Sequence, residues 1–110
     1  MSKRDWKILL EDIIESIDKI EKYTAGMSFE EFETNNLIID AVVRNIEIIG
    51  EASKNVPFEV QNQLPDIPWQ KLRGIRNRIV HDYFDVDRTI IWHIVSAELS
   101  LLKKSLQQYL

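Results

Sequence analysis

The sequence contains no cysteine, so disulfide bonds, thiolate nucleophiles and cysteine-ligated zinc sites are all excluded. Two histidines are too few for a metal site built from several histidines in one chain, and we predict neither a metal nor another cofactor. Three glycines and three prolines are too few for a turn-rich β protein. No apolar run approaches the roughly 18 residues of a membrane span. Acidic residues also interrupt the N-terminal segment, so we expect no signal peptide, no membrane contact and a cytoplasmic location.

What the chain does contain is typical of a globular domain. Its 110 residues are 45% apolar and 29% charged, which favours one domain over residues 1–110 and argues against intrinsic disorder. The net charge is −4, yet residues 71–78 (KLRGIRNR) hold four basic residues and no acidic one. This contrast can focus an anionic ligand onto one part of the surface. A solvated basic helix face is the alternative.

Apolar residues recur at helical spacing along most of the chain. The first stripe follows steps of three and four: Trp6, Leu10, Ile13, Ile17 and Ile20. We expect this helix to be capped by Ser2 or Asp5 and to end at Ala25–Gly26, where glycine suits a left-handed stop. Residues 28–31 form a capping box that predicts a short helical turn.

The second half of the chain is also predicted to be helical. A long helix over about 36–54 contains Gly50, which we attribute to the close approach of another helix. A short helix at 58–64 and a helix from about Pro68, which carries the basic stretch, should follow. The last helix is capped by Asp85 or Asp87, and its predicted inner face consists of Ile91, Val95, Leu102 and Leu106. The predicted fold is all-α, an antiparallel bundle of three long helices and two or three short ones.

Residues 76–83 combine the side chains needed for chemistry on a phosphodiester. Arg76 supplies a guanidinium suited to phosphate, and His81 can both accept and donate a proton near neutral pH. Such a pair can serve transesterification in RNA, where the ribose 2′-OH attacks its own phosphorus. On an ideal helix the two side chains lie about 140° apart. Either the helix loosens near His81, or the groups converge across the boundary between two subunits.

The sequence resembles the HepT-like branch of the HEPN superfamily over nearly its whole length. The family motif Rx4HxY is matched by Arg76, His81 and Tyr83, with the polar Asn77 directly after the arginine. Residues 44–52 (RNIEIIGEA) and 68–77 (PWQKLRGIRN) also look like the family. The resemblance implies a metal-independent ribonuclease that acts as a homodimer with the motif at the interface.

The resemblance further implies a toxin of a type VII-like toxin–antitoxin pair. Its partner would be a minimal nucleotidyltransferase antitoxin that adenylylates Tyr83 and thereby silences the enzyme. A bulky AMP group beside Arg76 and His81 would block the cleft and compete for its cations.

Each candidate residue also has a plain structural interpretation. His81 can be a buried structural histidine, and Arg76 can be a salt-bridge residue within a helix. Asn77 either supports the helix or orients the site, while Arg73 and Arg78 either bind RNA or are solvated. Asp82 either orients His81 or caps a helix. His93 is expected to be a surface or interface residue.

Two other functions compete with the nuclease. The chain can be a non-catalytic helical partner and adenylyl acceptor of a nucleotidyltransferase, or a module that binds RNA or nucleotides without cleaving them. The presence of both Arg76 and His81 favours the enzyme.

Overall fold

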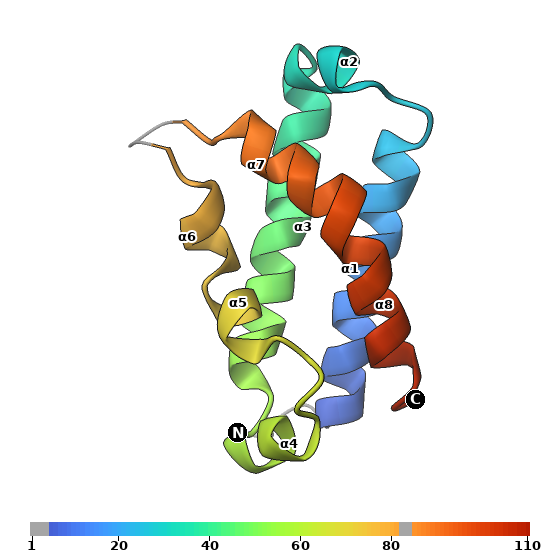
Figure 1. The fold of residues 1–110 in the computed structure, drawn as a ribbon, viewed down its shortest axis with the longest axis vertical. Helices are drawn as coiled ribbons and strands as arrows, with labels where there is room; N and C mark the ends of the chain where they lie inside the picture. The colour runs from blue at the N-terminus through green and yellow to red at the C-terminus, as the bar shows by residue number, and fades with distance from the viewer. Residues whose placement is uncertain (1–4, 82–84) are drawn as a thin grey trace.

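The computed structural model describes residues 5–81 and 85–110. Two long helices, α1 (Trp6–Thr24) and α3 (Asn36–Asn55), run antiparallel and pack along each other (Figure 1). A third long helical segment lies against α1 and consists of α7 (Arg88–His93), the π-helical turn η1 (Ile94–Glu98) and α8 (Leu99–Gln107). The prediction of an all-helical protein with three long helices is confirmed.

Short helices complete the bundle: α2 (Phe29–Glu33), α4 (Phe58–Gln63), α5 (Trp69–Arg73) and α6 (Ile75–Ile79). The helix expected from about Pro68 is therefore two helices, because the chain leaves helical geometry at Gly74. Glycine has a low helix propensity, so leaving helical geometry at this position costs little free energy. In Figure 1, α5 and α6 lie beside α3 and run antiparallel to it.

The helix ends follow the capping residues found in the sequence. Asp5 accepts a hydrogen bond from the backbone N–H of Lys7 at the start of α1, and Ser28 forms the predicted capping box. The helix α1 stops before Gly26, whose φ of 75° lies in the left-handed region that suits glycine. Of the two candidate caps for the last segment, Asp87 is the one used, since its carboxylate accepts from the N–H of Ile90.

The hydrophobic core lies between α1, α3 and the last helical segment. The expected stripe of α1 is buried, with Trp6 only partly covered at its edge. The inner face of the last segment differs from the prediction because Val95 is only partly buried. The residues that are buried there instead are Ile91, Ile94, Leu99, Leu102 and Leu106. The step of five from Ile94 to Leu99 is the one that a π-helical turn produces.

Gly50 marks the contact between α3 and the basic stretch, as predicted. A Cβ atom built at Gly50 would lie 3.3 Å from Cγ2 of Ile75 and 3.6 Å from the carbonyl oxygen of Leu72. Glycine therefore lets the backbone of α3 approach α5 and α6 closely. This approach sets the distance of the basic stretch from the rest of the bundle.

Replacing Gly50 with leucine is expected to lower the free energy of unfolding by about 1–3 kcal/mol, because the larger side chain must push α5 and α6 away. Urea titration followed by circular dichroism measures the change. Glu51→Leu, at the exposed neighbouring position, is the control and should change stability much less. Equal losses in the two variants would contradict a packing role for Gly50.

Candidate active site

The short helix α6 holds Arg76 and Asn77 at the surface. Its two isoleucines, Ile75 and Ile79, are buried against the core, so this face of the helix points inward. Arg76 and Asn77 lie on the remaining surface of α6 and are exposed. Within the described parts of the chain, neither side chain forms a hydrogen bond or an ion pair with another residue, so both are open to a ligand from solvent.

The chain leaves the helix before His81. The helix α6 ends at Ile79, Val80 is extended, and Val80 pairs with Val86 in an isolated antiparallel bridge. The backbone N–H of His81 donates to the carbonyl oxygen of Asp85 at 3.1 Å, and the N–H of Asp87 donates to Ile79 at 2.7 Å. The expectation that the helix loosens near His81 is confirmed, so the 140° separation of an ideal helix does not apply to Arg76 and His81.

His81 is exposed and directly follows the bridge residue Val80. The interpretation of His81 as a buried structural histidine is therefore wrong. Two residues of interest lie outside the described residues: Asp82, expected either to orient His81 or to cap a helix, and Tyr83, expected to accept AMP.

Arg78 lies on the side of α6 that faces η1, where its side chain contacts Glu98. Its two terminal nitrogens donate to the two carboxylate oxygens at 2.9 and 2.7 Å, a bidentate pair. The hydrogen bonds from Arg78 lower the pKa of Glu98 below its usual value, and the same contact raises the pKa of Arg78. Arg78 thus has a structural partner, and its contact with RNA stays a prediction.

Arg73 is also engaged within the protein. Its guanidinium donates to the side-chain oxygen of Gln61 and lies 5.6 Å from the centre of the Phe58 ring. Gln61 in turn donates to the carbonyl oxygen of Val56 at 2.9 Å. Arg73 therefore links α5 to α4, and a role in RNA binding is likewise untested.

Glu98 is a residue that the sequence interpretation did not single out. Besides Arg78 it contacts Lys71 at 3.7 Å and His93 at 3.5 Å. His93 itself is 65% exposed, which agrees with its prediction as a surface residue. One signal was available in the sequence: Glu98 falls three residues after Val95 and four before Leu102, so it interrupts the predicted apolar face with a charge.

The structure is a helical bundle in which α6 and the residues directly after it expose an arginine, an amide and a histidine. These are side-chain types that bind phosphate or transfer protons in many enzymes. The profile of the family described as "Ribonuclease HepT-like" matches residues 13–109. The chain belongs to this family of ribonucleases, as its sequence motifs indicated.

Relatives with curated names agree with this assignment. The chain is 38% identical to "Putative RNase MJ1380" of Methanocaldococcus jannaschii, over 97% of this chain and 98% of that protein. It is 42% identical to "Probable ribonuclease HepT" of Thermococcus cleftensis, over 92% of both chains. It is 36% identical to "Putative RNase TTE0752" of Caldanaerobacter subterraneus, over 92% of this chain and 90% of that protein. No matching solved structure was found.

Across residues 5–81 and 85–110, no helix has both the length and the apolar character that crossing a lipid bilayer requires.

Proposed function

We propose that this protein is a metal-independent endoribonuclease that cleaves RNA by transesterification at Arg76 and His81. The observation that carries the proposal is the joint exposure of Arg76 and Asn77 on α6 and of His81 two residues after it. The 2′-oxygen of the ribose attacks phosphorus while the bond to the 5′-oxygen breaks. A base takes the proton of the 2′-OH, an acid protonates the leaving 5′-oxygen, and the guanidinium stabilises the charge on the phosphoryl oxygens. The products are a 2′,3′-cyclic phosphate and a 5′-hydroxyl.

The site works as a homodimer in this proposal. Each chain contributes one histidine to the motif, whereas cleavage uses both a base and an acid. A two-fold dimer supplies two copies of His81 and Arg76 to one cleft and doubles its positive charge. Val80, next to His81, is a branched apolar residue that is 44% exposed, and burial against a second copy would remove it from water. Light scattering measures the mass of the active species. A mass equal to that of one chain would contradict the proposed dimer.

The direct test of the proposed function uses total RNA and a chelator. In EDTA, the purified protein should cleave RNA and leave 2′,3′-cyclic phosphate ends, because no step uses a metal. An oligonucleotide with a single 2′-deoxy sugar should resist cleavage at that position. Cleavage of the deoxy position, or loss of activity in EDTA that magnesium restores, would contradict the mechanism. Binding without any cleavage would favour the RNA-binding module instead.

The cellular role we propose is that of a toxin whose antitoxin is a minimal nucleotidyltransferase. That enzyme would transfer AMP from ATP to the hydroxyl of Tyr83 and release pyrophosphate. The support is the Rx4HxY motif, which places Tyr83 two residues after His81. An adenylyl group there adds a phosphate anion next to the cations of the site.

Tyr83→Phe is expected to keep cleaving RNA while escaping silencing, because phenylalanine lacks the hydroxyl that accepts AMP. Incubation with a minimal nucleotidyltransferase of the kind proposed as the antitoxin and with ATP, followed by intact-mass measurement, should give a gain of one AMP for the unaltered protein and none for the variant. Tyr23→Phe, which alters an exposed tyrosine of α1, is the control. An AMP adduct on the Tyr83→Phe variant would show that another residue is the acceptor.

A further inference from the structure

The π-helical turn η1 determines where Glu98 lies. The last helical segment buries Ile94 and Leu99 on its inner face, five residues apart. A regular α-helix would instead continue this face at positions 97, 98 and 101. The extra residue of the π turn rotates Glu98 off the core and toward α6, where its side chain is 24% exposed. Single π turns inside helices are frequently found at functional sites.

The ion pair between Arg78 and Glu98 spans a gap in the packing. A cavity of about 250 Å³ lies between α5 and α6 on one side and η1 and α8 on the other, and both residues line it. The apolar contacts of α6 are made by Ile75 and Ile79 on its inner face. The bidentate ion pair between Arg78 and Glu98 joins α6 to the last helical segment across this cavity, and its two parallel hydrogen bonds restrict the relative orientation of the two side chains.

The helix α6 depends on such contacts for its orientation. It has five residues and no side-chain cap at its first turn. A helix this short is not stable by itself in water, so tertiary contacts determine its placement. Arg78 lies two residues after Arg76 and three before His81, which means that a tilt of α6 at Arg78 moves both candidate catalytic side chains.

We infer that Glu98 is a positioning residue of the ribonuclease site, which acts through Arg78 to hold Arg76 and His81 in their reactive arrangement. This inference rests on the proposed function of Arg76 and His81. It assigns to Arg78 a role in orienting the site, in place of direct contact with RNA. Two consequences follow: the loss of Glu98 should lower turnover more than substrate affinity, and Glu98 should have no effect once Arg78 is absent.

The test compares Glu98→Gln, Arg78→Gln and the double variant in RNA cleavage. Each single variant should lower kcat roughly 10-fold with KM within about twofold, since displacement of a catalytic group by about 1 Å can cost up to 100-fold. The double variant should be no slower than the worse single variant, because both residues act through one contact. Hydrogen exchange of the amides of residues 75–81 should become faster in all three variants.

Lys103→Met is the matched control. Lys103 of α8, which is 28% exposed and so resembles Arg78 at 27%, forms an ion pair at 2.6 Å with Asp18 of α1. This contact joins α8 to α1 and does not involve α6. This variant should leave kcat within about twofold and should not change hydrogen exchange in residues 75–81. It separates a general loss of stability from a loss of orientation at the site.

Several results would overturn the inference. A raised KM with unchanged kcat in Arg78→Gln would mean that Arg78 binds RNA directly. Additive losses in the double variant, or unchanged exchange of residues 75–81 in Glu98→Gln, would each show that Glu98 does not hold the site. Failure of the proposed function would give a different result: Arg76→Ala would then cleave RNA as well as the unaltered protein does. In that case, the hydrogen-exchange measurement would still show whether Glu98 holds residues 75–81 in place.

Discussion

His81→Ala is expected to reduce RNA cleavage by at least roughly 100-fold, because general acid–base catalysis by a positioned side chain contributes about that much or more. The fold should be unaffected. His81 is exposed, and the one backbone contact described for it, from its N–H to Asp85, does not involve the imidazole. The measurement is cleavage of a fluorescent RNA oligonucleotide in EDTA, with circular dichroism and light scattering to check fold and dimer.

His93→Ala is the matched control for this prediction. His93 is the other histidine of the chain and is exposed on the outer face of the last helical segment. His93 lies 3.5 Å from Glu98, but the two hydrogen bonds between Arg78 and Glu98 do not involve the imidazole and should persist without it. Cleavage by this variant should remain within about twofold of the unaltered protein, which is small beside the loss expected from general acid–base catalysis. Full activity of His81→Ala, or equal losses in the two variants, would remove His81 from the mechanism.

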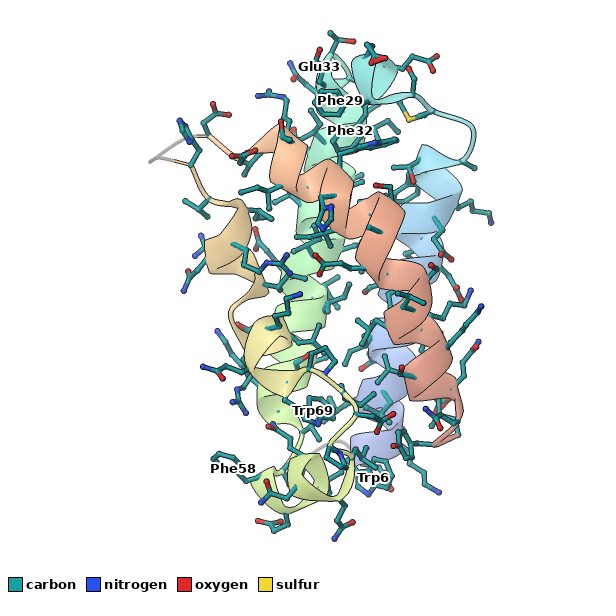
Figure 2. All side chains as sticks on the ribbon, viewed as in Figure 1. Trp6, Phe29, Phe32, Glu33, Phe58 and Trp69 are labelled. Atoms are coloured by element: carbon teal, nitrogen blue, oxygen red, sulfur yellow. The ribbon has the colours of Figure 1, made fainter. Side chains whose placement is uncertain are left out.

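The largest effect on stability is expected at Phe32. Phe32 is fully buried, and the centroids of its ring and of the Trp92 ring are 5.0 Å apart. This contact anchors the five-residue helix α2 to α7 (Figure 2). Phe32→Ala should lower the free energy of unfolding by about 3–5 kcal/mol, through lost burial and the cavity left behind. Small domains have a total stability of only about 5–15 kcal/mol, so this change consumes much of it. Urea unfolding followed by tryptophan fluorescence measures the loss.

Phe29 offers the comparison for this variant. It belongs to the same helix and lies 6.3 Å from the same tryptophan, but it is only partly buried. Phe29→Ala should therefore cost clearly less than Phe32→Ala. If the two substitutions cost the same, burial is not what anchors α2, and the aromatic contacts themselves would be responsible.

The sequence predicted the long helices because their apolar spacing and capping residues agree. Asp5, Gly26 and Ser28 marked real boundaries, and Gly50 marked a real contact between helices. The break at Gly74 and the π turn at η1 were not predicted. Both depend on tertiary packing: Ile75 must reach the core next to α3, and Leu99 must replace Glu98 on the inner face. Periodicity within one helix does not contain that information.

The candidate site was predictable in its residue types but not in its surroundings. The motif identified Arg76, Asn77 and His81, and the structure exposes all three. The internal partners of Arg73 and Arg78 come from segments 12 and 20 residues away, so a local basic stretch gave no sign of them. Net charge alone made all four cations of residues 71–78 look equally available.

The π turn also has a consequence for deletions in the last helical segment. It places one additional residue in the middle of the helix while the two halves keep their packing. Between Ile94 and Leu99, a regular helix with the same two residues buried would need one residue fewer. Deleting the exposed Ala97 would therefore keep both halves packed but turn the Glu98 carboxylate toward the apolar interior.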